Sequence, residues 1–425
     1  MKYLPSCLLF TYFLGIAPLS AQQFEYSIDD REIVPGIHML ICDAGGYIVT
    51  AVASTGPDGL LLVDTGFKQL APIFRERVES FGLGPPKVIF NTHTHVDHTG
   101  CNHLYGEEAI IIAHDTVRTR MRSGRYVLEE YPDEALPDIT FTDSLTVHFN
   151  GDEIRILAIP GSHDDSDAIV HFRKTGVVFM SDLYYGKSFP TVDGEYGNAA
   201  TYPQTLDRAM ELLPEHVQLI PGHGTYVGTM ADLREYRDVL NRTIHIVQKG
   251  YKKGKSVEEL QQAQVLRDWE QWGDEQAATT DYWIMAVSRS FDQQKFGAKK
   301  SLAQPLYYAL QEGDARSAIA RYYELKQSSP DEYNFTVGGL YNVAFNYLLT
   351  KERNEDAIEL FLLIIEEFPD TQYLWAIHDT LGELYRKLGH HERAIAHYEQ
   401  VLELKPGNPN ATAMLQELSA ETSGE

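Results

Sequence analysis

The amino-acid sequence predicts a layered α/β sandwich followed by an all-helical repeat domain. Short apolar runs typical of strands alternate with helical stretches over residues 37–220. Polar residues gather where several of these runs end. Strands, then helices, then strands again favour a layered sandwich over a doubly wound sheet. A sequence repeat near the C-terminal end predicts the helical domain.

The chain is acidic and long enough for more than one domain. It has 425 residues, of which 43% are hydrophobic, a formal net charge of -25 and a pI of about 5.0. This length predicts one large and one smaller domain, or two to three domains. An acidic surface repels nucleic-acid backbones and anionic membranes, so we expect neither as a partner.

Residues 1–21 have the pattern of a secretory signal peptide. Lys2 supplies a positive charge, residues 8–17 are apolar, and the small Ala21 precedes a cut ahead of Gln22. The apolar run is shorter than the roughly 20 residues that a membrane-spanning helix needs. We therefore expect a secreted or periplasmic protein.

Two cysteines, Cys42 and Cys101, would remain in the mature chain. Two cysteines do not make a disulfide framework, although they could pair in an oxidising compartment. We favour buried free thiols.

The strands of the sandwich are predicted from β-branched and apolar runs bounded by Gly, Asp and Pro. Asn150-Gly151 joins two of these runs and is a strong signal for a two-residue hairpin. Helical spacing of apolar residues predicts a helix over residues 68–81. The predicted strands are residues 37–41, 47–53, 60–63, 87–90, 109–113, 140–149, 153–159, 168–172 and 177–180, and one that ends at Ile220.

From Ala231 onward the pattern predicts helices. Residues 232–247 have apolar side chains at helical spacing, and Ser256 is placed to cap a further helix. Residues 293–301 are basic and polar, which predicts a linker between two domains. We expect a catalytic domain over residues 22–295 and a repeat domain over residues 302–425.

The repeat consists of three matching triplets with internal offsets of four and then eight residues. This pattern resembles tetratricopeptide repeats, in which each unit is a pair of helices. The small Ala would lie where two helices touch, and the aromatic residue would fill the groove. Leu381, Gly382, Tyr385 and Gly389 complete the pattern in the last unit. The triplets are Ala318, Tyr322 and Pro330; Ala357, Phe361 and Pro369; and Ala394, Tyr398 and Pro406.

The densest group of potential metal ligands follows the predicted strand at residues 87–90. It comprises His93, His95, Asp97 and His98. Side chains two residues apart on an extended segment point the same way, so His93 and His95 can bind one metal together. After the chain turns, Asp97 and His98 can face a second metal. Imidazole and carboxylate at this density suit Zn, Fe or Mn better than Ca or Mg.

Four other predicted strand ends also carry polar groups, namely Asp64, His163, Asp182 and His223. A single His after a strand is usually structural. A dense cluster of His and Asp, accompanied by polar residues at four other strand ends, instead indicates a functional site. In these motifs and their order, residues 32–240 resemble the metallo-β-lactamase fold superfamily. The resemblance implies a four-layer αβ/βα sandwich.

The resemblance also implies a dinuclear zinc centre, with Asp64 orienting one ligand by a hydrogen bond. The set resembles that of the glyoxalase II and lactonase branch and includes no Cys. Residues 184–198 resemble the variable pocket loop of secreted hydrolases, and residues 162–167 lack a Gly that relatives often carry there. The first metal would be held by His93, His95 and His163, the second by Asp97, His98 and His223, and both by Asp182.

The implied chemistry is hydrolysis. Two zinc ions about 3.5–4 Å apart would share a hydroxide that attacks a carbonyl or phosphoryl centre. Asp97 is the candidate proton carrier for the leaving group. Tyr184, Tyr185 and Lys187 follow Asp182 and are candidates to line the pocket.

Three functions are compatible with these patterns. The leading hypothesis is a dinuclear zinc hydrolase that cleaves an ester, thioester, lactone or amide, with a β-lactam among the candidates. Its partners would be a small-molecule substrate and a protein bound by the helical repeats. The second is an iron-dependent oxidoreductase like the family's persulfide dioxygenases. The third is a binding protein in which the repeats act and the metal site is a relic.

Overall fold

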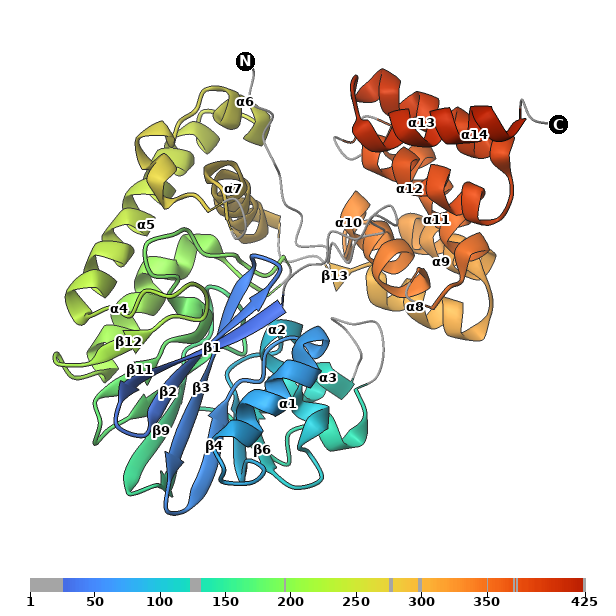
Figure 1. Ribbon diagram of the computed structural model, residues 1–425. Coiled ribbons are helices and arrows are strands. Elements are labelled where there is room, and N and C mark those ends of the chain that lie inside the picture. Colours follow the sequence, from blue (N-terminus) through green and yellow to red (C-terminus); the bar gives the residue numbers. More distant parts are fainter. Residues whose placement is uncertain are drawn as a thin grey trace. The chain divides into compact units, whose positions relative to one another are not determined.

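The chain forms two compact units, residues 26–296 and residues 300–422, each with its own packed interior (Figure 1). The computed structural model describes residues 26–122, 131–194, 196–274, 278–296, 300–349, 351–369, 371 and 374–422. The predicted signal peptide lies outside these residues. No helix within the described ranges is long and apolar enough to cross a membrane.

The first unit contains a seven-stranded sheet in which the strands follow chain order. Its first four strands pair antiparallel, and its last four pair parallel. The strands are β1 (Tyr26–Val34), β2 (Ile37–Ala44), β3 (Ile48–Gly56), β4 (Gly59–Val63), β5 (Val88–Asn91), β6 (Ile110–His114) and β7 (Ile139–Phe141).

A second, five-stranded sheet has the order β12-β11-β10-β9-β8. The strands β8 and β9 form the predicted hairpin, with Asn150 at φ 50° and Gly151 at φ 73° in the turn. Two positive φ angles in a two-residue turn match the twist of the flanking strands. The strands are β8 (Ser144–Phe149), β9 (Asp152–Ala158), β10 (Ala168–Phe172), β11 (Val177–Phe179) and β12 (Gln218–Ile220).

The single strand predicted over residues 140–149 is wrong. The chain leaves the first sheet after β7 and enters the second sheet at β8. Phe141 of β7 and Leu145 of β8 both pack in the core between the two sheets. The alternation of buried side chains therefore continues in phase across the break, and the sequence pattern does not reveal it.

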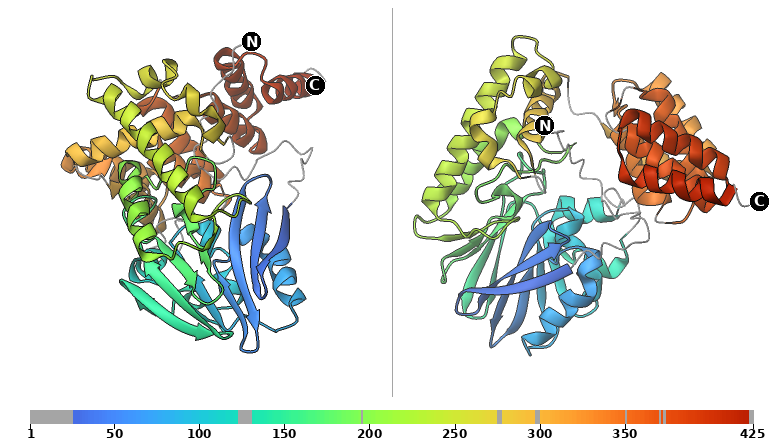
Figure 2. Two further views of the ribbon diagram at one scale, coloured as in Figure 1. Left: turned by 90° about the vertical axis from the view of Figure 1, so that its left-hand side faces the viewer. Right: turned by 45° about the horizontal axis from the view of Figure 1, so that its top comes forward.

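Helices cover the outer faces of both sheets, which confirms the four-layer sandwich (Figure 2). On the first sheet, Phe74 and Val78 of α1 (Ala71–Ser80) pack in one cluster with residues of β4, β5 and β6. On the second sheet, α4 (Tyr202–Leu212), α5 (Met230–Tyr251) and α7 (Thr280–Phe296) share a core with β10, β11 and β12.

Cys42 and Cys101 are free and buried in the core beneath α1. Burial raises the pKa of the Cys101 thiol to about 12. Burial and the neighbouring Cys101 also raise the pKa of Cys42. Such protonated thiols are poor nucleophiles and poor metal ligands, which agrees with the structural role expected for them.

Side-chain caps define two helices at the end of the first unit. Thr229 and Asp232 form a capping box at the start of α5, and Ser256 and Glu259 form another at α6 (Val257–Gln262). The predicted cap at Ser256 is thus confirmed.

The boundary between the two units lies within the predicted linker at residues 293–301, but secondary structure extends into both of its ends. Helix α7 continues to Phe296, and Lys300–Ser301 forms the short strand β13, which pairs with β14 (Tyr333–Asn334). Gln and Lys are good helix formers, so the polar composition that indicated a linker is equally compatible with a helix. Residues 297–299 lie outside the described part of the chain.

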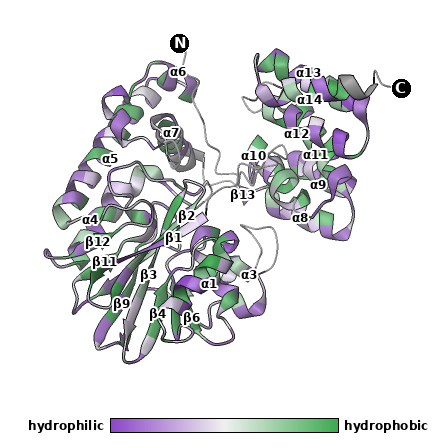
Figure 3. Cartoon of the chain, in the orientation of Figure 1, coloured by the Kyte–Doolittle hydropathy of each residue, from purple (hydrophilic) through white to green (hydrophobic). Residues whose placement is uncertain are grey.

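The second unit is helical apart from this small sheet, and its helices carry both hydrophobic and hydrophilic residues (Figure 3). The repeated Ala and aromatic residues, from Ala318 to Tyr398, are all fully buried. A Cβ added at Gly382 would lie 2.7 Å from the ring of Tyr398, so the predicted close contact between two helices exists. The helices are α8 (Ala303–Glu312), α9 (Ala315–Ser328), α10 (Val337–Tyr341), a π-helical turn (Asn342–Leu348), α11 (Asn354–Glu367), α12 (Leu374–Lys387), α13 (His391–Leu404) and α14 (Pro409–Thr422).

The contact at Gly382 provides a test of this packing. We expect Gly382→Ala to lower the free energy of unfolding by about 1–2 kcal/mol, because the added methyl group overpacks against Tyr398. The matched control is Gly338→Ala in α10, where the nearest atom to the new Cβ would be 3.9 Å away. Ala is the better helix former, so this change should be neutral or stabilising by up to about 1 kcal/mol. Equal shifts in denaturant unfolding, followed by circular dichroism, would contradict the packing described.

Candidate metal centre

The seven predicted ligands and Asp64 come from segments that follow five different strands. Asp64 follows β4, the His93–His98 group follows β5, and His163 lies between β9 and β10. Asp182 follows β11, and His223 follows β12. The strands β4 and β5 are parallel neighbours, as are β11 and β12, so within each pair the polar groups emerge at the same edge of the sheet.

A buried network of amides fixes the turn after β5. The side chain of Asn91 donates to Asn102 Oδ1 at 3.1 Å and to the carbonyl oxygen of His98 at 3.3 Å. Asn102 donates in return to Asn91 Oδ1 at 2.8 Å, and the hydroxyl of Thr65 donates to Asn102 at 3.0 Å. All of these side chains are fully buried. The network holds the short helix α2 (Val96–Thr99), which carries Asp97 and His98.

Two strand ends adopt an uncommon backbone conformation at the centre. Asp64 has φ 60° and Ser181 has φ 49°, values that non-glycine residues rarely adopt. This turn directs the Asp64 carboxylate back onto the backbone N–H of Thr92 at 2.8 Å and onto His98 Nδ1 at 2.8 Å. A Cβ at Gly222 would overlap Asp182 Oδ1, so only glycine fits beside that carboxylate.

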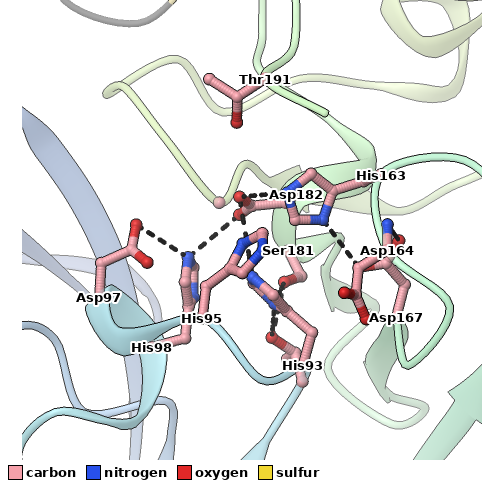
Figure 4. Close-up of polar contacts among 12 residues, drawn as sticks. His93, His95, Asp97, His98, His163, Asp164, Asp167, Ser181, Asp182 and Thr191 are labelled. Atoms are coloured by element: carbon pink, nitrogen blue, oxygen red, sulfur yellow. Dashed lines mark hydrogen bonds and ion pairs between the residues drawn. The ribbon is translucent and has the colours of Figure 1, made fainter. Parts of the chain in front are cut away.

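The structure brings all seven predicted ligands into two adjacent groups of donor atoms, each group lying within 4.8 Å. Asp182 belongs to the first group and also contacts the second. Its Oδ2 lies 3.3 Å from His163 Nε2 and 3.0 Å from His223 Nε2, and its Oδ1 lies 3.2 Å from His98 Nε2. Figure 4 shows its carboxylate between His98 and His163. The groups are His93, His95, His163 and Asp182, and Asp97, His98 and His223.

At this centre, three imidazoles present a buried Nε2 atom that makes no hydrogen bond among the described residues, although two of these atoms lie within 3.3 Å of the Asp182 carboxylate. They belong to His93, His98 and His163. Their opposite nitrogens are all engaged. His98 Nδ1 contacts Asp64, and His163 Nδ1 contacts Asp167 at 2.9 Å. His93 Nδ1 lies 3.0 Å from the hydroxyl of Thr92. Such contacts fix the tautomer and leave a lone pair on Nε2, so these residues fit a bound cation.

The charges at the centre also fit a cation. Burial opposes ionisation of Asp182, but the imidazoles of His223 and His98 outweigh it and hold the pKa of this carboxyl well below its usual range. Burial and the neighbouring His98 hold the pKa of His93 well below its usual value. An ionised carboxylate and a neutral imidazole are the forms that bind metals. At His98 and His163 burial opposes protonation, but the neighbouring carboxylates outweigh it and raise the pKa of both imidazoles, that of His163 to about 9. A cation that binds there therefore displaces a proton from each.

Three residues after Asp182 were predicted to line the pocket, and in the structure each of the three lies in a different environment. The hydroxyl of Tyr185 donates to Asp182 Oδ2 at 2.7 Å, and its ring stacks on His223 with centroids 4.8 Å apart. Tyr184 instead packs against Tyr236 in the helical core. The ammonium group of Lys187 lies over the ring of Tyr226.

Two carboxylates that contact the predicted ligands were missed in the sequence. Asp167 accepts from His163 Nδ1, and Asp193 lies 3.3 Å from His95 Nε2. Asp167 stands four residues after His163, and this spacing is a signal that could have identified it. Asp193 is far from His95 in the chain, and no local pattern connects the two.

The contact between Asp64 and His98 provides a test of the second group. We expect Asp64→Ala to weaken zinc binding at this group by about 10–100-fold, because His98 loses the carboxylate that orients it. Competition with a chromophoric chelator measures the affinity. The control is Asp207→Ala, which removes an exposed carboxylate paired with Arg237. If both variants bound zinc as tightly as the unaltered protein, Asp64 would not orient this ligand.

Comparison with known proteins gives matches over both units. Residues 44–244 match the family model described as Metallo-beta-lactamase superfamily, and residues 375–408 match the model described as Tetratricopeptide repeat. A curated relative, Metallo-beta-lactamase type 2 from Bacteroides fragilis, is 27% identical over 117 residues. That alignment covers 27% of this chain and 46% of the relative, so the chain spans about half the length of that protein.

Solved structures similar to this chain include two metallo-beta-lactamases. A metallo-beta-lactamase from Pontibacter korlensis has a TM-score of 0.44 and 16% identity, covering 50% of this chain and 99% of that protein. The DIM-1 metallo-beta-lactamase has a TM-score of 0.45 and 15% identity, covering 51% of this chain and 99% of that protein.

Proposed function

Since residues 44–244 form a metallo-beta-lactamase superfamily domain and a tetratricopeptide repeat follows at residues 375–408, we propose that this chain is a metal-dependent hydrolase. One observation carries the proposal. Two adjacent groups of His and Asp donors meet at the Asp182 carboxylate, and three buried Nε2 atoms around it make no hydrogen bond to any other residue that the structure describes. A buried set of this kind is costly to keep unless a cation binds there.

The metals that this centre would hold are two zinc ions. The donors are five imidazoles and two carboxylates, which suit zinc, with iron as the alternative. Two groups of three or more donors favour two ions over one. Bound zinc lowers the pKa of water to about 7 and so supplies a nucleophile at neutral pH.

The proposed substrate is an ester, thioester, lactone or amide, and a β-lactam is one member of the last class. A donor set without Cys supports this choice, because it resembles that of the glyoxalase II and lactonase branch. The name of the curated relative favours testing β-lactams as well. The substrate would be a small molecule, and a protein partner would bind at the helical repeats.

Asp97 is the residue that we assign to proton transfer. Its Oδ2 lies 3.6 Å from His98 Nε2 and 3.5 Å from His223 Nε2, beside the second group of donors. The residue is 8% exposed, whereas His93, His98 and His163 are fully buried. Asp97 can therefore exchange a proton with a leaving group that enters from solvent.

Tyr185 would hold Asp182 in place. Its hydroxyl lies between Asp182 Oδ2 at 2.7 Å and the hydroxyl of Thr191 at 2.6 Å. This contact restricts rotation of the carboxylate that both groups share.

The proposal also places the protein outside the cytoplasm, because residues 1–21 have the pattern of a signal peptide.

Metal content and hydrolysis test the proposal together. Protein produced without added zinc and then titrated with it should bind two zinc ions per chain. It should hydrolyse at least one substrate in a screen of nitrocefin, lactones, thioesters and phosphodiesters. A chelator should abolish this activity, and zinc should restore it. Asp97→Ala should lower kcat/KM by about 100-fold or more, in the range expected for a proton-transfer group.

Two results would overturn the proposal in favour of the alternatives. One iron per chain with oxygen consumption would indicate an oxidoreductase of the persulfide dioxygenase type. If the protein's effect in the producing cell persisted in Asp97→Ala and was lost on deletion of the repeats, the chain would act as a binding protein.

Tyr185 and Tyr184 form a matched pair for a finer test. Tyr185→Phe removes the hydrogen bond to Asp182 but keeps the ring on His223, and we expect kcat to fall by about 10-fold or more. The hydroxyl of Tyr184 is buried and makes no hydrogen bond to the residues that the structure describes, so Tyr184→Phe should leave kcat unchanged. Equal rates for the two variants would show that Tyr185 does not act on Asp182.

A further inference from the structure

His95, like His98 and His163, contacts a carboxylate that is not one of the predicted ligands, but it does so through a different ring nitrogen. In His98 and His163 the contacting atom is Nδ1, which meets Asp64 and Asp167. In His95 it is Nε2, which lies 3.3 Å from Asp193 Oδ2. We infer that His95 turns the opposite ring nitrogen, Nδ1, toward the first group of donors.

Asp193 is itself held against the first group. Its Oδ1 accepts the backbone N–H of Tyr196 at 2.6 Å, and its own backbone N–H donates to the carbonyl oxygen of His163 at 2.9 Å. Its side chain is only 9% exposed. A Cβ at Gly197 would overlap the carbonyl oxygen of His163, so the segment fits closely against this turn. One residue thus connects two predicted ligands of the same metal.

Helix α7 fixes this segment from the other side. The guanidinium of Arg289 donates to the carbonyl oxygens of Val192 at 3.0 Å and Asp193 at 3.1 Å. The hydroxyl of Tyr282 accepts the backbone N–H of Val192 at 2.9 Å. Helix α7 lies outside residues 44–244, the part of the chain that matches the superfamily model. An element beyond that match therefore contributes to the centre.

A separate cation site at Asp193 is the competing interpretation. The side chains of His95, Asp164 and Asp193 offer ligand atoms within 4.8 Å of one another. However, Arg120 donates to both carboxylate oxygens of Asp164, at 3.2 and 2.9 Å. Asp164 thus already pairs with a buried guanidinium, which it shares with Asp165, and this pairing favours orientation of His95 over a third ion.

We propose that Asp193 is a positioning residue for His95 and that Arg289 holds Asp193 in place from helix α7. The inference rests on the proposed metal centre. An anionic carboxylate that accepts from Nε2–H fixes the tautomer of His95 and makes its other nitrogen a better donor. Truncation of Asp193 should therefore weaken binding of one zinc ion and leave the second ion unaffected.

Zinc titration with a competing chelator tests this proposal without any substrate. We expect Asp193→Ala to weaken one of two zinc sites by about 10–100-fold and Asp193→Asn to recover part of that loss. Arg289→Gln should weaken the same site. In cobalt-substituted protein, Asp193→Ala should alter the visible absorption of that site alone. Asp207→Ala serves again as the exposed-carboxylate control.

The outcomes separate the inference from the proposed function. If the unaltered protein bound no zinc, both would fail. If it bound two ions and Asp193→Ala bound them equally well, only the inference would fail. Equal weakening at both sites, with a lower melting temperature of the metal-free protein, would show a merely structural role and also overturn it. Three ions in the unaltered protein and two in Asp193→Ala would establish the cation site instead. Should Asp193→Ala not fold, Asp193→Asn decides by the same cobalt spectrum.

Discussion

The buried carboxylate of Asp182 is the constraint on which the rest of the centre depends. It lies within 3.3 Å of imidazole nitrogens from His98, His163 and His223, which reach it from three different segments of the chain. An isolated charge at this depth would be strongly unfavourable, and so would several imidazoles without partners. Placed together, the two kinds of group form a set of donors that a cation completes. The tight turn at Ser181 and the absence of a side chain at Gly222 both serve to place this one carboxylate.

The outer contacts explain why the imidazoles point inward. Asp64 and Asp167 each hold an Nδ1 atom, while the backbone carbonyl of Ile48 holds that of His223 at 2.8 Å. Each contact engages one of the two ring nitrogens and directs the other toward the centre. These contacts restrict rotation of the rings and so lower the cost of ordering the donor atoms around an ion. Asp193 extends the same principle to His95 through a segment that helix α7 supports.

The sequence was informative where the determining interactions are local. The hairpin at Asn150-Gly151 and the cap at Ser256 depend on a few adjacent residues, and both were predicted. The strand break after Phe141 was not, because the alternation of buried side chains is the same whether the chain stays in one sheet or crosses to the other. Composition likewise failed at Phe296, since polar residues suit both a linker and an exposed helix. The contacts of Asp193 and the burial of Tyr184 depend on segments that are distant in sequence. Such contacts leave no local pattern from which they could be predicted.

We propose that two metal ions, one in each group of donors, share the Asp182 carboxylate. Crystals of the full chain grown with zinc, and measured with X-rays at the zinc absorption edge, test this most directly. The account predicts two anomalous peaks about 3.5–4 Å apart, one on each side of the Asp182 carboxylate. A single peak bound by only one group, or no peak within reach of Asp182, would contradict it.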